Sequence, residues 1–268
     1  MHIEIGAVTD VGLEREWNED SFLLWDLSTR KPLDPDSGTD FPCGTNVLLL
    51  AVSDGMGGAQ RGDLASQTTV KALQASVQGE FVDGMRVSPE LGRCLERGVQ
   101  AANHQVYGVT VERPELHRMG ATLSAAILDG ETVSIAHVGD SRIYLCRAGG
   151  LRQLTVDHTH VQNLVAMGRV DQARAHLHPQ RHLLVRAIGT DESVEVEQFS
   201  QPVCEGDTVL ICSDGLHSMV DESDMLTVLQ APESVLTQCQ QLVELANAAG
   251  GNDNVTVVIA RLVRESAV

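Results

Sequence analysis

The sequence predicts an α+β protein built on antiparallel sheets. Strand-like segments follow one another in runs and helical segments come in pairs, whereas a parallel α/β fold would alternate strand and helix. The chain has 268 residues, of which 43% are hydrophobic, enough to bury a sizeable core. Because no linker, repeat or low-complexity tract divides it, we expect a single domain over residues 1–268.

The elements follow from the spacing of apolar residues. Alternating or continuous apolar residues predict strands, and apolar residues three and four apart predict helices. A polar segment rich in His and Arg, residues 155–190, interrupts this pattern. We expect strands at 2–8, 22–26 and 46–52, helices at 63–78 and 89–110, strands at 120–128, 132–138, 142–147, 193–199 and 208–212, helices at 221–229 and 233–249, and a strand at 255–262.

The charge excludes some classes of function. The chain carries 19 Lys and Arg against 37 Asp and Glu, a net charge of −18. Nucleic-acid binding needs clustered cations, and membrane-surface binding needs a basic face, so we expect neither. The longest uncharged apolar stretch, residues 41–53, is shorter than the roughly 18–20 residues that span a bilayer, and no signal-peptide pattern opens the chain. The excess of Asp and Glu can keep the protein soluble, and some of these carboxylates can also bind metal ions.

The cysteines indicate a reducing environment. None of them forms a CxxC pair, and most lie in apolar or helical segments, where a free cysteine behaves as a small hydrophobic residue. We therefore expect a reduced, cytoplasmic protein without a cysteine metal site. The six cysteines are Cys43, Cys94, Cys146, Cys204, Cys212 and Cys239.

A carboxylate at the end of an apolar strand is the most informative pattern. Asp54 follows LLLAVS, Asp140 follows SIAHVG and Asp214 follows VLICS, while Asp253 stands just before VTVVIA. Strand ends of one sheet system open onto a common edge, so these four side chains can converge on one cleft.

The alternative for an Asp-Gly pair is a hairpin turn. Asp129-Gly130 fits that alternative because a strand follows directly, and it predicts a two-residue type I′ turn. The pairs that begin at Asp54 and Asp214 do not fit, because no strand returns after them.

Crowded carboxylates repel one another unless a cation lies among them. An all-oxygen site suits Mg²⁺ or Mn²⁺, whereas Zn²⁺ prefers His and Cys. Two such ions about 3.5–4 Å apart can activate a water and stabilise an in-line displacement. This combination indicates hydrolysis of a phosphoester.

Other candidate groups are less distinctive. Arg15 can bind a phosphate with its planar fork, although a surface arginine paired with neighbouring glutamates is the alternative. The glycine spacing at 57–64 lacks the Lys of a nucleotide-binding loop, and no cysteine has the surroundings of a nucleophile. The histidines clustered in the 155–190 segment allow a zinc site, but hydrogen-bonding histidines in a flap are the commoner alternative. They are His158, His160, His176, His178 and His182.

Seven motifs, in one order along residues 5–262, resemble those of the metal-dependent PP2C (PPM) protein serine/threonine phosphatases of the bacterial type. They are Arg15-x-x-Asn18-Glu19-Asp20, Ser53-Asp54-Gly55-Met56-Gly57-Gly58, Gly120-Ala121-Thr122, His137-Val138-Gly139-Asp140-Ser141-Arg142, Leu154-Thr155-x-Asp157-His158-Thr159, Ser213-Asp214-Gly215-Leu216 and Asn252-Asp253-Asn254-Val255-Thr256.

The resemblance implies a central β-sandwich of two antiparallel sheets flanked by pairs of helices, with a small flap at 155–190. It implies two Mn²⁺ or Mg²⁺ ions, and a weaker third ion shared by Asp140 and Asp214. A hydroxide bridging the two ions would attack phosphorus, Asp54 would bridge the same ions, Arg15 would bind the phosphoryl group, and Glu19 would act through bound water. The implied ligands are Asp20, Asp54, Asp214, Asp253, the Gly55 carbonyl and, for the third ion, Asp140.

The position after Asp54-Gly55 departs from the animal members, which carry a histidine there that looks like a proton donor. Met56 occupies it here, as in the bacterial branch, and cannot give a proton. His158 is a candidate donor. Since every ligand position is filled, we expect an active phosphatase. The resemblance further implies that it acts on phosphorylated proteins and opposes a cognate Ser/Thr kinase, and we expect a monomer. A non-catalytic phospho-dependent regulatory module on the same fold, or a phosphatase of small phosphoesters, are the alternatives.

Overall fold

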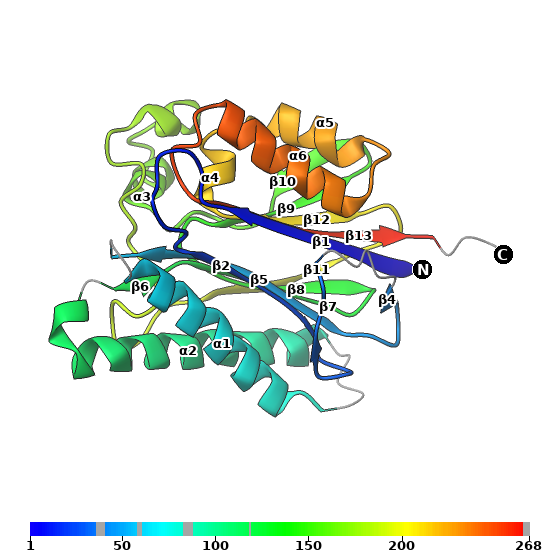
Figure 1. The fold of residues 1–268 in the computed structure, drawn as a ribbon, viewed down its shortest axis with the longest axis horizontal. Coiled ribbons are helices and arrows are strands. Elements are labelled where there is room, and N and C mark those ends of the chain that lie inside the picture. The colour runs from blue at the N-terminus through cyan, green and yellow to red at the C-terminus, as the bar shows by residue number, and fades with distance from the viewer. Residues whose placement is uncertain (36–40, 58–60, 83–87, 118, 265–268) are drawn as a thin grey trace.

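The computed structural model describes residues 1–35, 41–57, 61–82, 88–117 and 119–264. Gly58 of the second motif lies outside these residues. Two sheets face one another in a sandwich, with helices on both outer faces (Figure 1). Every strand pair in the described chain is antiparallel, so the predicted α+β sandwich is confirmed.

The first sheet joins segments from both ends of the chain. The first strand of the protein pairs along its whole length with the last, which sets the two termini at the same end of the sandwich (Figure 1). In spatial order this sheet consists of β10 (Gly150–Gln153), β9 (Arg142–Arg147), β12 (Thr208–Cys212), β13 (Val255–Val263), β1 (His2–Asp10) and β4 (Phe41–Pro42).

The second sheet is built mainly from the middle of the chain. Its order is β11 (Glu197–Pro202), β8 (Thr132–Val138), β7 (Leu123–Leu128), β5 (Leu48–Met56), β2 (Asp20–Asp26) and β3 (Lys31–Pro32), with β6 (Gly120–Ala121) paired to the end of β5.

Strand β5 shows why this sheet is apolar on both faces. Leu48, Leu50 and Val52 belong to the core between the two sheets, while Leu49 and Ala51 belong to the core beneath the helices. Because successive side chains of a strand point to opposite faces, a continuous apolar run fits a strand that is covered on both sides.

The helices cover the outer faces in pairs. On the second sheet lie α1 (Gly62–Glu80) and α2 (Ser88–Glu112), and on the first sheet lie α5 (Glu222–Gln230) and α6 (Val235–Ala248) (Figure 1). Shorter elements are the 3₁₀ turn η1 (Pro114–Leu116) and the one-turn helix α4 (Asp214–His217). None of the helices in the described part of the chain has both the length and the apolar character needed to cross a bilayer.

One end of the sandwich collects the irregular segments. The loop 11–19, helix α4 and the segment 155–190, which we call the flap segment, lie at the left-hand end of Figure 1. The flap segment contains α3 (His160–Ala166) and the 3₁₀ turn η2 (Gln172–Leu177). Thr159 caps α3, since its side chain accepts a hydrogen bond from the backbone N–H of Gln162.

Two sequence-based expectations about the fold need correction, and three short strands were not predicted. The hairpin between β7 and β8 forms, but Asp129 has no positive φ, so the turn is not type I′; its Oδ1 accepts the N–H groups of Glu131 and Thr132 instead. The strand expected at 193–199 begins only at Glu197. The short strands β3, β4 and β10 were not predicted, because two to four residues carry no periodic pattern.

All six cysteines lie in the described chain and are free.

Candidate active site

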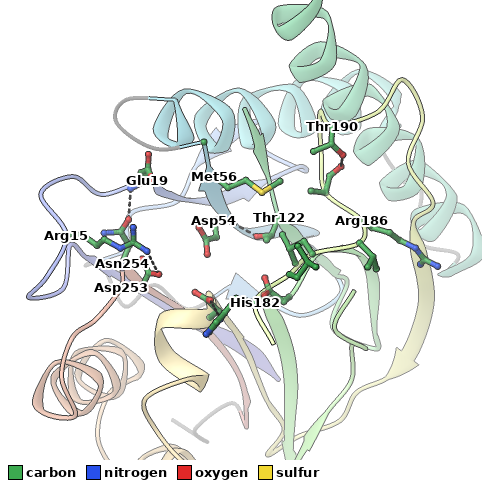
Figure 2. Close-up of a pocket in the computed structure, with 18 of the residues that line it drawn as sticks. Arg15, Glu19, Asp54, Met56, Thr122, His182, Arg186, Thr190, Asp253 and Asn254 are labelled. Carbon is green, nitrogen blue, oxygen red and sulfur yellow. Dashed lines mark hydrogen bonds and ion pairs between the residues drawn. The ribbon is translucent and has the colours of Figure 1, made fainter. Parts of the chain in front are cut away.

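A cavity of about 580 Å³ opens between the two sheets at the end that holds the loops. Its lining comes from strand ends of both sheets and from the flap segment (Figure 2). Seven of the eight site residues expected from the sequence line it: Arg15, Glu19, Asp54, Gly55, Asp140, Asp214 and Asp253. Asp20, the eighth, is buried behind the lining.

Asp20 and Asp54 lie directly opposite one another on β2 and β5. Two like charges at opposed positions of neighbouring strands repel, and burial makes that repulsion stronger. Burial and then the neighbouring carboxylates raise the pKa of Asp20 to about 7 and the pKa of Asp54 well above its usual value. The fold therefore holds this pair at an electrostatic cost.

Three more carboxylates reach the same cavity from the first sheet and its connections. Asp214 follows β12, Asp253 precedes β13, and Asp140 lies where the chain passes from β8 in one sheet to β9 in the other. Burial and the charge of Asp214 raise the pKa of Asp140 well above its usual value. His217 fixes this turn, because its Nε2 lies 2.9 Å from the carbonyl oxygen of Asp140.

The donor set fits divalent cations. Asp20 Oδ2 accepts hydrogen bonds from Ser213 Oγ and Thr256 Oγ1, each at 2.7 Å, whereas its Oδ1 is buried without a partner. Asp214 Oδ1 is also buried without a partner. Buried carboxylate oxygens without donors are costly, and a cation with oxygen preference would satisfy them.

Gly55 follows Asp54 at a point where two backbones touch. A Cβ on this residue would lie 1.9 Å from the carbonyl oxygen of Gly62, which begins α1. The Gly55 N–H also donates to the carbonyl oxygen of Glu19 at 3.1 Å. Only glycine allows the end of β5 to approach the start of α1 this closely, and this approach sets the Gly55 backbone at the cavity.

Arg15 pairs with a residue far away in the sequence instead of with its own segment. Its Nη2 donates to Asp253 Oδ2 at 2.7 Å, and this hydrogen bond raises the pKa of the guanidinium (Figure 2). The alternative of a surface arginine paired with Glu14, Glu16 or Glu19 is not what the structure shows, since its ion pair is with Asp253. Arg15 is half-exposed, so its remaining N–H groups can meet a ligand.

Asn254 holds the loop that carries Arg15 and Glu19. Its Oδ1 accepts the Glu19 N–H at 2.8 Å (Figure 2). Its Nδ2 donates to the carbonyl oxygens of Val11 and Trp17, each at 2.9 Å. The sequence analysis named Asn254 only as a member of a motif. Its role in holding the loop could not be predicted, because hydrogen bonds between segments far apart in the sequence produce no local sequence pattern.

Glu19 is oriented toward the start of α1. Its Oε1 accepts the Gly62 N–H at 3.3 Å, and its carbonyl oxygen accepts the hydroxyl of Ser66 at 2.6 Å. Burial, together with repulsion from Asp63 and Asp253, raises the pKa of the Glu19 carboxyl.

His158 does not fit the role of a proton donor at this site. It lies outside the cavity lining, and burial beside Arg186 lowers its pKa to about 4, so it is neutral at pH 7. Its Nδ1 faces the Gly139 N–H at 3.2 Å and its Nε2 faces Arg186 Nη1 at 3.3 Å. His158 therefore anchors the flap segment to the turn before Asp140.

The alternative of a zinc site among the five flap histidines finds little support. Within the described residues, one set of three His, Cys, Asp or Glu side chains has its donor atoms within 4.8 Å of one another: His137, His158 and Glu197. Both nitrogens of His158 already face N–H groups, which leaves it poorly placed to bind a metal. The aspartates line one cavity, but in the described residues no three of them have carboxylate oxygens that all lie within 4.8 Å of one another.

Two further residues of the cavity lining, Met56 and His182, bear on the proton donor and on the flap segment. Met56 lines the cavity and offers no proton (Figure 2). His182, the last residue of the His-Pro-Gln-Arg-His run in the flap segment, places its Nδ1 3.8 Å from Asp214 Oδ2. The flap segment thus reaches the carboxylates directly.

Comparison with known proteins agrees with this geometry. The family model described as protein phosphatase 2C matches residues 41–248. The serine/threonine phosphatase Stp of Listeria welshimeri is 38% identical over 84% of this chain and 88% of its own length. The serine/threonine protein phosphatase PstP of Mycobacterium tuberculosis is 41% identical over 97% of this chain, which spans only 45% of that longer protein.

A solved structure carries metal on the same fold. The catalytic domain of PstP in complex with two manganese ions is 35% identical, covers 98% of this chain and 99% of its own, and superposes with a TM-score of 0.79. The matched motifs, the sandwich and the relatives lead to one conclusion: the chain belongs to the protein phosphatase 2C family.

Proposed function

We propose that this protein is a metal-dependent serine/threonine phosphatase that removes phosphate from phosphoserine and phosphothreonine in proteins. One observation carries the proposal: aspartates from both sheets meet in one cavity beside Arg15 with buried carboxylate oxygens that no protein group satisfies. The family relationship, and relatives named as serine/threonine phosphatases, support the same activity.

The carboxylates would hold two divalent ions, Mn²⁺ or Mg²⁺. We assign Asp20, Asp54, Asp214, Asp253 and the Gly55 carbonyl to these two ions, with Asp54 between them. Asp140 and Asp214 would share a weaker third ion. All-oxygen donors and the raised pKa of Asp20, Asp54 and Asp140 support this assignment, since a cation among these carboxylates would remove the repulsion.

The remaining chemistry belongs to the protein side chains. Divalent ions bound here would activate a water as nucleophile and offset charge on the phosphoryl oxygens. Arg15 would orient the phosphoryl group with N–H donors set toward the cavity by its bond to Asp253. Glu19 would hold ordered water at the cavity wall. Met56 gives no proton, so the leaving oxygen must take its proton from water or another group.

We further propose the setting in which the enzyme works. Residues 1–268 would form one catalytic domain with the flap segment at its mouth. The protein would act in the cytoplasm as a monomer and oppose a cognate Ser/Thr kinase. The acidic charge and the reduced cysteines support this setting.

Turnover of p-nitrophenyl phosphate and of a phosphothreonine peptide with Mn²⁺ tests the activity. We expect turnover of both, loss of turnover in EDTA, and a fall of about a thousandfold in the Asp54→Asn variant. Full activity in EDTA or in Asp54→Asn would contradict the metal assignment. Binding of the phosphopeptide without any turnover in Mn²⁺ would favour the alternative, a non-catalytic phospho-dependent module.

A further inference from the structure

The cavity has a second wall of a different chemical character. Its volume of about 580 Å³ is far larger than a phosphoryl group needs. The flap segment supplies Leu183, Leu184 and Val185 to the lining, and Met56 lies on the same lining. Leu183 is 52% exposed and Val185 is 45% exposed, so apolar surface stands open beside the carboxylates. We call these four residues the apolar wall.

Backbone hydrogen bonds fix the apolar wall in place. The Leu183 carbonyl oxygen accepts the N–H of His160 at 2.8 Å, and the Val185 N–H donates to the carbonyl oxygen of His158 at 2.9 Å. Beyond the wall, Ile188 exchanges two backbone hydrogen bonds with Ala121 of β6, at 2.7 and 3.1 Å. The segment is therefore tied at both ends, which makes it a preformed surface.

Arg186, which follows the apolar wall in the sequence, turns its guanidinium away from the cavity centre. Arg186 Nη2 lies 2.8 Å from Glu195 Oε2, and its Nη1 lies 3.3 Å from His158 Nε2. Figure 2 shows the guanidinium pointing outward from the aspartates. The apolar wall is thus left without a charged side chain of its own.

The loop that carries Arg15 also carries a large exposed apolar residue. Trp17 is 57% exposed, and its carbonyl oxygen accepts a hydrogen bond from Asn254, which lines the cavity. Arg15 is two residues away on the same anchored loop. Apolar surface therefore occurs on the loop of Arg15 as well as on the flap side of the carboxylates.

We propose that the apolar wall binds an apolar side chain one or two positions from the phosphorylated residue in an extended segment of the substrate protein. The inference rests on the proposed function, because it takes the phosphoryl group to lie at Arg15 and the aspartates. Burial of a leucine-sized side chain would favour such substrates by about tenfold or more in kcat/KM.

Two phosphopeptides test the inference. They are identical except that the residues flanking phosphothreonine are Leu in one and Ser in the other, and kcat/KM is measured for both with Mn²⁺. We expect a Leu-to-Ser peptide ratio of about ten for the wild type, near one for Leu183→Ser, and unchanged for Leu177→Ser. Leu177 is the matched control, because it lies in the same flap segment, is 70% exposed, and stands outside the cavity lining.

Binding separates failure of this inference from failure of the proposed function. The same peptides, labelled with fluorescein, are titrated with Asp54→Asn protein and followed by anisotropy. A Leu preference in binding with no turnover in the wild type would uphold the wall and overturn the phosphatase proposal. Turnover with a ratio near one would overturn the wall and leave the activity standing. A dimer that Leu183→Ser dissociates, with a ratio near one, would assign the wall to a second copy of the chain and overturn the inference.

Discussion

An aspartate lies before strand β12 and another lies after it, and the two differ in how their carboxylate oxygens are satisfied. Before the strand, Asp207 accepts hydrogen bonds from Arg147 Nε at 2.8 Å and from the Cys204 N–H at 2.7 Å. These bonds hold the pKa of Asp207 below its usual value in spite of its burial. After the strand, Asp214 lines the cavity with Asp54 and Asp140, and its Oδ1 is buried without a partner. Burial raises the pKa of Asp214, but His182 beside Oδ2 outweighs it, so this pKa is lowered too, without an arginine partner.

The Asp207 end is an ion pair that stabilises the fold, whereas the Asp214 end belongs to the candidate active site. At the Asp207 end the chain supplies the counter-charge itself. At the Asp214 end it gathers carboxylates with few protein cations, so the missing positive charge must come from outside. Substitutions at the cavity and at Asp207 test this difference.

The largest loss of stability is expected at Gly55, where the backbones of β5 and α1 are in close contact. Gly55→Ala would force a Cβ to within 1.9 Å of the Gly62 carbonyl oxygen, so the end of β5 and the start of α1 must separate. We expect a loss of about 3 kcal/mol or more in the free energy of unfolding by urea. Gly79→Ala, with open space around it in α1, is the control and should change stability by about 1 kcal/mol at most. Equal effects of the two substitutions would contradict this reading.

Asn254→Ala removes the three hydrogen bonds that hold the Arg15 loop. We expect a fall of about tenfold or more in kcat/KM, since a misplaced phosphate-binding group loses orientation, together with a loss of about 2 kcal/mol in stability. The exposed Asn252 provides the control, and Asn252→Ala should leave both quantities near the wild type. Unchanged kcat/KM in Asn254→Ala would show that the loop needs no such anchor.

The smallest effect is expected at the paired end of β12. Because its folded pKa is lowered, Asp207 contributes stability at pH values above its unfolded pKa of about 4, and this contribution is lost as pH falls through the folded pKa. Asp207→Asn should therefore cost about 1 kcal/mol at pH 7, and the difference from wild type should shrink toward pH 3. Urea unfolding at both pH values measures it, and a difference that stays constant would contradict the ion-pair account.

Much of the fold could be predicted because its strands bury both faces. The apolar run of β5 and the strand bounds of β8, β9 and β12 were readable from residue pattern alone. The paired helices followed from their spacing. The flap segment could be recognised as helical only in places, because α3 has seven residues and η2 has six, too few for a periodic pattern to give their bounds.

The site divides in the same way. The aspartates could be predicted because each closes or opens an apolar strand, and strand ends converge. Their arrangement could not, because the pairing of Asp20 with Asp54 depends on sheet register. The same limit applies to Asn254, whose partners are more than two hundred residues distant, and to the apolar wall, whose role depends on which way Arg186 turns.

The binding of divalent ions by the crowded carboxylates is the central claim, and thermal unfolding tests it most directly. Wild-type protein and Asp54→Asn are each unfolded in EDTA and in Mn²⁺ at about a hundredfold over its Kd. We expect Mn²⁺ to raise the wild-type Tm by about 5 °C or more and the Asp54→Asn Tm by much less. In EDTA the variant should be at least as stable as the wild type, because it removes one charge from the crowd. A wild-type Tm that Mn²⁺ leaves unchanged would contradict the account.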